Sequence, residues 1–382
     1  MLRCQMGRSA SPLADSPQSV SGRVAGGSFQ PRPGVPTGTE LRMAVLYVAS
    51  DREGAGKTSL CLALARSFEA AGKSVRVVKP VAGADLDADA DPDPKIIGSL
   101  LGQPADGWPV APGQTSLNYA VLRDAVAVVA KATEGTDIVI VEASCALSPE
   151  ESARMAEAMD ATAMVVVRYL RELTASDVKP LAEAFGDRFA GCVINGLTRY
   201  MGTELQAKLL PSLESEGVKC LGVIPEERRL LGVTVGELAQ HLNGRLIVCG
   251  EETNGLVEYL LVGMPGMDPG EFYFGIRERK AAIVRGDRPD LQFAAINTDA
   301  ACLVLTKGIE PIEYVRYEAE QEEVPVMVVD TDTLTTMDAL NTLMDGARFD
   351  HPLKLERLAS LVESHLDIPA LLNSLGVGGG NG

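Results

Sequence analysis

The chain has 382 residues, of which 46% are hydrophobic and 23% charged, the composition of a globular protein long enough for two domains. Its formal net charge of −17 disfavours nucleic acids and anionic membrane surfaces, because both are bound by clustered lysines and arginines. We therefore expect no nucleic-acid or membrane partner, and any anion site must be built locally from loop amides and a few cations.

Residues 1–42 are rich in Ser, Gly and Pro and lack hydrophobic periodicity. This composition predicts a disordered extension, and its lack of an apolar core disfavours a secretory signal. Met43, directly before the first expected strand, is an alternative start of the protein. A transit peptide is the other interpretation of the extension.

Cysteine and histidine spacing gives no metal or redox motif. None of the 7 cysteines stands at Cys-x-x-Cys spacing, and the 3 histidines form no His-Glu-x-x-His pattern. Most cysteines fall in apolar runs, which predicts buried free thiols in a reducing compartment. No apolar run approaches the roughly 18 residues of a membrane helix. We therefore predict a cytoplasmic protein.

A glycine-rich loop between an expected strand and an expected helix is the strongest functional signal. It reads Ser50-Asp51-Arg52-Glu53-Gly54-Ala55-Gly56-Lys57-Thr58. Backbone N–H groups of such a loop and of the next helix face an anion, and the helix dipole favours negative charge there. Lys57 would reach the outer phosphates of a nucleotide, and the Thr58 hydroxyl would bind Mg²⁺. A Gly-Lys-Thr triplet in an ordinary turn is the alternative, which the flanking strand and helix disfavour.

Short β-branched runs alternate with longer amphipathic stretches between residues 43 and 245, which predicts an α/β domain of the P-loop NTPase type. Strands that are apolar on both faces imply a mostly parallel sheet with helices on both faces. The expected strands are Ala44–Val48, Val75–Val78, Ile138–Val141, Ala163–Val167, Gly191–Ile194 and Cys220–Val223. The expected helices include Ser59–Ala71, Lys95–Leu101, Leu117–Ala132 and Glu204–Leu210, the last ended by Pro211.

Three polar residues, Lys79, Glu142 and Asn195, follow the ends of expected strands. Polar strand ends are common, but here they share the ligand-binding edge of the sheet with the glycine-rich loop. Glu142 is placed to hold Mg²⁺, and Lys79 is a second cation over the phosphates. Asn195 carries an amide that can both donate to and accept from an adenine edge.

The loop Asp85–Asp93 alternates carboxylates with other residues. A calcium-binding loop is excluded, because its sixth position is Ala90 rather than Gly and its twelfth is Ile96 rather than Glu. A solvated, self-repelling loop is the ordinary interpretation. Asp93, at the edge of the following helix, is the residue that we expect near a metal.

These motifs resemble dethiobiotin synthetase and the cobyrinic acid a,c-diamide synthases, and most closely the synthetase-like N-terminal domain of bacterial phosphate acetyltransferases. The matching elements are the long phosphate loop, Lys79-Pro80-Val81, Asp93, Val141-Glu142 and Ile194-Asn195-Gly196. The resemblance implies ATP and Mg²⁺ as cofactors, and a dimer or higher homo-oligomer. It implies Lys57 and Lys79 as catalytic cations, and Thr58, Asp93 and Glu142 as metal ligands. The implied nucleotide-binding residues are Ser50, Glu53, Gly54, Ala55, Gly56, Lys57, Thr58, Ser59 and Asn195.

The chain also departs from this pattern. Ser50 replaces the usual first glycine, and Glu142 is followed by Ala143-Ser144-Cys145-Ala146 instead of the glycine turn of the synthetase. That turn lines the substrate pocket in the synthetase, so its loss argues against dethiobiotin formation and leaves ATP binding in place. Arg52 is either a surface residue or, as in related partition ATPases, one that reaches across a dimer.

A second alternating unit, residues 246–346, predicts a smaller α/β domain. Polar residues again follow its strands and would surround a small anionic or nucleotide ligand, with turns and helix caps as the alternative interpretation. The segment Gly286–Asp290 resembles the DRTGG domain. The expected second ligand site consists of Gly286, Asp287, Arg288, Thr306 and Thr331. The expected strands are Leu246–Cys249, Ala281–Val284, Ala301–Leu305 and Val326–Val329, and the expected helices are Asp290–Asn297, Ile312–Gln321 and Leu334–Leu343.

We divide the chain into an extension at 1–42, a P-loop domain at 43–245, a DRTGG-like domain at 246–346, and a helix with a Gly-rich tail at 347–382. The expected function is ATP and Mg²⁺ binding coupled to sensing of an unknown small ligand, with a regulatory role in acyl-phosphate or central metabolism. The alternatives are an ATP-dependent ligase that activates a carboxylate or carbamate, and a scaffold that binds no nucleotide. ATPase or ligase activity stays open, and the acetyltransferase catalytic domain is not matched, so we do not expect a phosphate acetyltransferase by itself.

Overall fold

The computed structural model describes residues 43–104, 108–113, 116–249, 253–263, 266 and 270–378. The predicted disordered extension, residues 1–42, and the last four residues of the Gly-rich tail lie outside the described residues.

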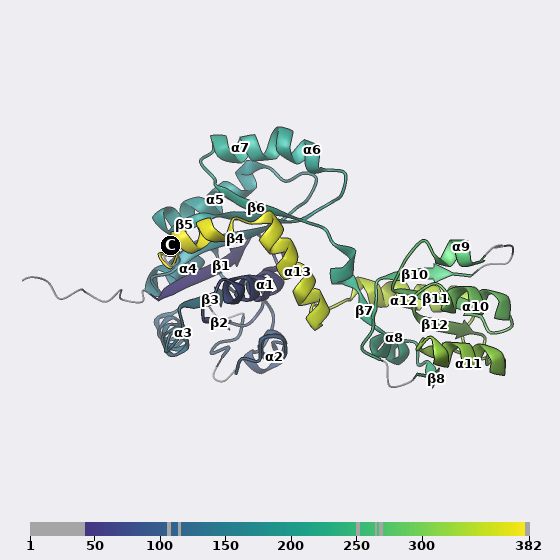
Figure 1. Cartoon of the computed structure of the whole chain (residues 1–382). Coiled ribbons are helices and arrows are strands. Elements are labelled where there is room, and N and C mark those ends of the chain that lie inside the picture. The colour runs from purple at the N-terminus through teal and green to yellow at the C-terminus, as the bar shows by residue number, and fades with distance from the viewer. Residues whose placement is uncertain are drawn as a thin grey trace, which may run out of the picture. The chain divides into compact units, whose positions relative to one another are not determined.

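The first domain is built on a six-stranded sheet in the order β2-β3-β1-β4-β5-β6 (Figure 1). Every neighbouring pair of strands is parallel, so all six strands point their carboxyl ends to the same edge. The strands are β1 Ala44–Ser50, β2 Val75–Val78, β3 Ile138–Glu142, β4 Thr162–Arg168, β5 Phe189–Leu197 and β6 Cys220–Pro225. The predicted parallel sheet of a P-loop-type α/β domain is confirmed.

Helices cover both faces of this sheet, and their apolar sides form one continuous core with it. Helix α1 contacts β2 and β3 and packs on α13 from the end of the chain (Figure 1), while α3, α4 and α5 pack against one another and against the sheet. The helices of this domain are α1 Lys57–Ala70, α2 Asp93–Leu101, α3 Tyr119–Ala132, α4 Pro149–Ala158, α5 Ala175–Phe185, α13 Pro352–His365 and α14 Ile368–Ser374.

The prediction that Pro211 ends a helix is wrong. The chain passes from a short helix, α6 Gly202–Glu204, through a π-helical turn at Leu205–Leu209 into α7 Leu210–Ser215. Pro211 therefore stands in the first turn of α7, where its missing N–H has no intrahelical partner to lose. The π-helical turn changes the hydrogen-bond register just before the proline, which lets the helical path continue.

The second domain has a five-stranded sheet in the order β10-β11-β12-β13-β8. Its first four strands are parallel, and β8 pairs antiparallel with β13 at the edge. The strands are β8 Arg245–Val248, β10 Tyr259–Val262, β11 Lys280–Arg285, β12 Ala300–Thr306 and β13 Val326–Val328, and a small ribbon joins β7 Val233–Thr234 to β9 Leu256–Val257. Sequence patterns predicted the other four sheet strands and did not indicate β10.

Alternate side chains of β11, β12 and β13 enter two separate apolar clusters, one on each face of this sheet. One cluster includes side chains from α9, α10 and α11, and the other includes side chains from α8 and α12. The helices are α8 Val235–His241, α9 Gly270–Phe274, α10 Pro289–Ile296, α11 Glu313–Gln321 and α12 Thr333–Asp345.

We expect the packing of α13 to contribute strongly to the stability of the first domain. Leu358 is 4% exposed in the core beside α1, so Leu358→Ala should lower the free energy of unfolding by about 2–5 kcal/mol. Urea unfolding followed by the fluorescence of Trp108, the single tryptophan of the chain, measures this change. Leu353→Ala is the matched control, because Leu353 lies in the same helix and is 36% exposed. Equal losses in the two variants would contradict the assigned packing.

Candidate functional site

The glycine-rich loop joins β1 to α1 and places the amide end of that helix at the carboxyl edge of the sheet. Gly54 and Gly56 have φ of +69° and +93°, in the left-handed region that favours glycine. Gly56 is also the N-cap of α1, so the free N–H groups of the first helical turn open beside it. Lys57 Nζ donates a hydrogen bond of 2.8 Å to Ser50 Oγ, which holds the ammonium against the loop. The loop therefore forms a cradle for an anion.

A cavity of about 390 Å³ lies over this loop and extends to the ends of β2 and β3. Among the residues predicted from the sequence, Lys57, Thr58, Lys79, Asp93 and Glu142 all line it. Its complete lining is Glu53, Gly54, Gly56, Lys57, Thr58, Ser59, Lys79, Gly83, Leu86, Asp91, Pro92, Asp93, Glu142, Ala143, Ser144 and Cys145. The predicted residues Ser50, Ala55 and Asn195 do not belong to this lining.

Lys79 lies among three carboxylates at one end of the cavity. Its Nζ is 2.9 Å from Asp91 Oδ2, 4.0 Å from Glu142 Oε1, and in direct contact with Asp93 Oδ2. The Lys79 and Glu142 side chains are 6% and 2% exposed. One ammonium thus joins the end of β2, the start of α2 and the end of β3.

Burial and the neighbouring charges together set the pKa values of these groups. Burial opposes the charged form of Lys79, but the carboxylates of Glu142 and Asp93 outweigh it and raise the lysine pKa. Burial also opposes ionisation of Asp91, but its hydrogen bond from Lys79 prevails and lowers the Asp91 pKa. At Glu142, burial is the larger effect, the charge of Asp93 adds to it, and the pKa is raised to about 7. Burial thus favours the protonated form of the Glu142 carboxyl.

The arrangement around Thr58 fits a magnesium ion. Thr58 Oγ1 donates to Glu142 Oε1 at 2.7 Å and lies 3.4 Å from Asp93 Oδ2. Glu142 Oε2 is buried and has no hydrogen-bond partner among the described residues. Within the same residues, no group of three His, Cys, Asp or Glu side chains is arranged to hold a metal. Mg²⁺ typically binds one or two carboxylates and completes its shell with water and phosphate oxygens, which these groups allow.

Asn195, at the end of β5, supports the loop from its other side. Its Nδ2 donates a hydrogen bond of 2.8 Å to the carbonyl of Ala55. A Cβ atom placed on Gly56 would lie 2.4 Å from the same nitrogen, so the loop and the amide fit only with glycine there. The proposed contact of Asn195 with an adenine stays a prediction.

Asp91 is the site residue that the sequence did not single out. It is 4% exposed and accepts hydrogen bonds from the backbone N–H of Gly83 at 2.8 Å and of Asp93 at 2.9 Å, besides its ion pair with Lys79. The alternating carboxylates of the loop were a signal, but nothing in that run distinguishes Asp91 from its neighbours. It positions both Lys79 and the start of α2.

The turn after Glu142 forms another wall of the cavity. Ser144 is 3% exposed, and its Oγ donates a hydrogen bond of 2.5 Å to the carbonyl of Ala82. Cys145 follows at the cavity surface as a free thiol of intermediate exposure. The turn Ala143–Cys145 therefore lines the cavity with no glycine in it.

The predicted second site gathers at the carboxyl ends of β11 and β12 and just beyond β13. Backbone hydrogen bonds join these ends, from Lys307 N to Thr331 O at 2.9 Å and from Gly286 N to Thr306 O at 3.4 Å. A Cβ atom on Gly286 would lie 2.1 Å from the Ile309 carbonyl oxygen, so a glycine is required there. The structure thus brings the five predicted residues to one edge of the sheet.

The side chains of this second group already have partners within the chain. Asp287 pairs with Arg285, and Arg288 pairs with Asp290 through two hydrogen bonds of 2.9 and 2.7 Å. The hydroxyl of Thr306 lies 3.1 Å from that of Thr333, and the hydroxyl of Thr331 lies 2.7 Å from that of Thr336. The binding of a ligand here stays a prediction.

Comparison with known proteins identifies the two domains. Residues 46–232 match the family model of the CobQ/CobB/MinD/ParA nucleotide binding domain, and residues 237–343 match that of the DRTGG domain. The chain therefore combines a P-loop nucleotide-binding domain of the CobQ/CobB/MinD/ParA type with a DRTGG domain. No helix in the described residues is long and apolar enough to cross a membrane.

The chain is distantly similar to the N-terminal part of phosphate acetyltransferases. The enzyme of that name from Pseudomonas putida is 25% identical over 374 residues, covering 85% of this chain and 51% of the relative. The one from Deinococcus radiodurans is 25% identical over 373 residues, covering 88% and 52%. The chain thus spans about half the length of these curated relatives, and the resemblance found in the sequence is confirmed.

Solved structures are similar at a lower level. The MinD cell division protein of Aquifex aeolicus is 17% identical with a TM-score of 0.34, covering 49% of this chain and 84% of that protein. The CBS and DRTGG domains of the regulatory region of Clostridium perfringens pyrophosphatase, complexed with diadenosine tetraphosphate, are 14% identical with a TM-score of 0.25, covering 41% and 74%.

We expect Gly56→Ala to destabilise the first domain more than Gly54→Ala does. Both residues have positive φ, so each alanine should cost about 1–2 kcal/mol. A Cβ at Gly54 meets no atom within 4 Å, whereas one at Gly56 overlaps Asn195 and should add about 1–3 kcal/mol. Urea unfolding followed by Trp108 fluorescence measures both, and Asn195→Ala should remove the additional loss. If the two glycine variants lose equal stability, the contact is misassigned.

The raised pKa of Glu142 predicts a pH dependence that Glu142→Gln removes. Its folded pKa of about 7 exceeds its ordinary value of 4.5, so between these values the folded chain holds a proton that the unfolded chain has released. The stability contribution is full below about pH 4.5 and is lost as pH rises through about 7. Unfolding free energies measured across this range in a chelating buffer should fall less steeply for the variant. Glu183→Gln, an exposed substitution on α5, should keep the wild-type slope, and an unchanged slope in Glu142→Gln would refute the assignment.

Proposed function

We propose that the first domain binds ATP with Mg²⁺ and that the nucleotide controls a regulatory protein. The observation that supports this most directly is the meeting of Lys57, Thr58, Lys79, Asp93 and Glu142 in one cavity over the glycine-rich loop. A cavity of about 390 Å³ lies within the range of small-molecule sites. The net charge of the chain is −17, so an anionic nucleotide depends on this local group of amides and cations.

The roles of the residues follow from their positions. The N–H groups at the start of α1 and the Lys57 ammonium bind the phosphates, because both face the loop. Lys79 stays charged within its carboxylates and adds positive charge to the lining of the same cavity. Thr58, Glu142 and Asp93 would hold Mg²⁺, which when bound neutralises phosphate charge and orients the outer phosphate. Asp91 positions Lys79.

We assign ligand sensing to the DRTGG domain. Its support is the convergence of Gly286–Arg288, Thr306 and Thr331 at one edge of a parallel sheet, where α/β folds bind ligands. The similarity to phosphate acetyltransferases suggests that the regulated process lies in acyl-phosphate or central metabolism. We also propose that the protein acts as a homo-oligomer in the cytoplasm.

An ATP-dependent ligase is the second candidate, and the shape of the cavity favours it. The lining continues past the phosphate cradle to the turn Ala143–Cys145, so an acceptor carboxylate or carbamate has a wall to bind against. The buried Ser144 fixes this turn, which then presents Cys145 rather than glycine to such an acceptor.

Lys57→Ala should weaken binding of Mg-ATP by about tenfold or more, because a charge-assisted contact to the phosphates is lost. Isothermal titration calorimetry of the full chain measures this. Lys95→Ala is the matched control, since Lys95 is exposed on α2 and lines neither the cavity nor its rim. GTP in place of ATP tests the choice of base.

The outcomes separate the candidate functions. A wild-type chain that binds no Mg-ATP would refute both nucleotide functions and leave the scaffold. Phosphate release that rises sharply on addition of one carboxylate or diamine would favour the ligase over the sensor. Equal weakening in Lys95→Ala and Lys57→Ala would show that the affinity reflects general charge and not the loop.

A further inference from the structure

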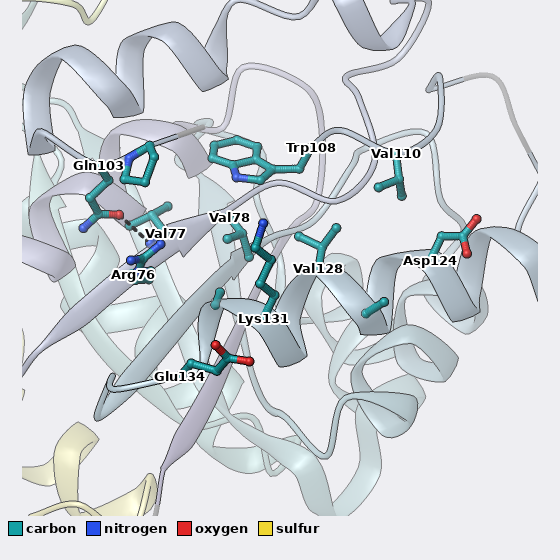
Figure 2. Close-up of a pocket in the computed structure, with 13 residues that line it drawn as sticks. Arg76, Val77, Val78, Gln103, Trp108, Val110, Asp124, Val128, Lys131 and Glu134 are labelled. Atoms are coloured by element: carbon teal, nitrogen blue, oxygen red, sulfur yellow. Dashed lines mark hydrogen bonds between the residues drawn. The ribbon is translucent and has the colours of Figure 1, made fainter. Parts of the chain in front are cut away.

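A second and larger cavity, of about 590 Å³, lies at the β2 edge of the first domain (Figure 2). Its floor is formed by Val77 and Val78 of β2, one side by Val128 and Lys131 of α3, and another by Trp108. This volume is within the range of small-molecule sites, and the walls are mainly apolar with a few polar groups. Neither domain family assignment gives it a role.

The strand edge inside this cavity is already closed. The side-chain amide of Gln103 accepts a hydrogen bond from the Val77 N–H at 3.0 Å and donates one to the Val75 carbonyl at 2.9 Å. A single side chain thus satisfies two backbone groups that an added strand would need. Figure 2 shows Gln103 beside Val77, where the first of these hydrogen bonds forms. The occupant of the cavity is therefore a compact ligand and not a peptide strand.

Trp108, Lys131 and Arg76 bring hydrogen-bond donors to the cavity. Trp108 is 8% exposed as a residue, and its indole N–H is accessible to solvent and makes no hydrogen bond to another described residue. Figure 2 shows the indole nitrogen on the side of the ring that faces Val78 and Lys131, with the lysine side chain rising toward it. Neither Lys131 nor Arg76 forms an ion pair with a described residue, although both line the cavity.

The two carboxylates of the cavity lining, Asp124 and Glu134, form no ion pair with Lys131 or Arg76 among the described residues. Asp124 forms an exposed ion pair with Arg123 at 2.7 Å. Glu134 is exposed, and Figure 2 shows the Lys131 side chain extending away from it toward Trp108. An accessible N–H without a hydrogen-bond partner and two cations without an ion pair among the residues that the structure describes, all beside an apolar wall, favour a ligand that accepts hydrogen bonds and carries negative charge.

We propose that this cavity binds a small organic anion, a carboxylate with a compact apolar body. The carboxylate accepts from the indole N–H of Trp108 and from Lys131, and the apolar body packs on Val78 and Val128. An inorganic anion would leave the apolar wall empty, and a neutral amide would forgo the charge-assisted bond. The chain carries a net charge of −17, so anion binding at this place must come from local contacts.

The fluorescence of Trp108 tests this directly, because it is the single tryptophan of the chain. The probe is cyclohexanecarboxylate, which has no interfering absorption, compared with acetate, inorganic phosphate and neutral cyclohexanecarboxamide. We expect a saturable change with cyclohexanecarboxylate and an affinity about tenfold or more above that of each comparison compound. No saturable change at millimolar concentration, or an equal affinity for the amide, would overturn the proposal.

Variants locate the binding at the cavity. Lys131→Ala should weaken the binding of cyclohexanecarboxylate by about tenfold or more, and Lys131→Arg should largely preserve it. Lys131 is exposed, so its removal leaves the fold intact, which circular dichroism checks. Lys95→Ala makes the same change of charge outside the cavity and should bind as the wild type does. If it weakens binding as much as Lys131→Ala, the anion is attracted by general charge and the site is wrongly placed.

Discussion

The ammonium of Lys79 is the interaction on which the first domain's site depends. Three carboxylates, Asp91, Asp93 and Glu142, converge on it from two other elements at the sheet edge. Ionised carboxylates in so buried a place are stable only when they are paired and hydrogen-bonded. The single Lys79 side chain at the end of β2 therefore fixes the loop before α2 and the end of β3, and with them the groups suited to a metal. Without it the carboxylates would repel one another across the cavity.

Local motifs made part of this site predictable. Lys57, Thr58 and Glu142 each stand at a fixed place after a strand or in the loop, and parallel topology brings such places to one edge. Asp91 was not predictable, because it belongs to a run of similar carboxylates. What distinguishes it is its burial against Lys79 and two backbone N–H groups, which arises only in the folded chain. When several aspartates alternate in one loop, the sequence alone does not indicate which of them is buried.

In the fold, too, features set by a short stretch of sequence were predictable, whereas contacts between distant segments were not. All six strands of the first sheet followed from short apolar runs, since a strand buried on both faces must be apolar throughout. Pro211 was expected to end a helix, but the π-helical turn before it places the proline in a first turn, where it is tolerated. The amphipathic pattern near the end of the chain predicted a helix there. The same pattern does not indicate that α13 packs on α1, which is seen only in the structure.

The cavity over the glycine-rich loop and the cavity at the β2 edge share one segment of chain. Val78 faces the cavity at the β2 edge, and the next residue, Lys79, lines the cavity over the glycine-rich loop. The segment after Trp108 continues this connection, because Val110 N donates to Pro80 O at 2.9 Å and Ala82 N donates to Ala111 O at 3.0 Å. Ser144, in the turn after Glu142, donates to the Ala82 carbonyl in turn. The backbones of the two linings are therefore joined by the peptide bond between Val78 and Lys79 and by a short hydrogen-bonded ladder.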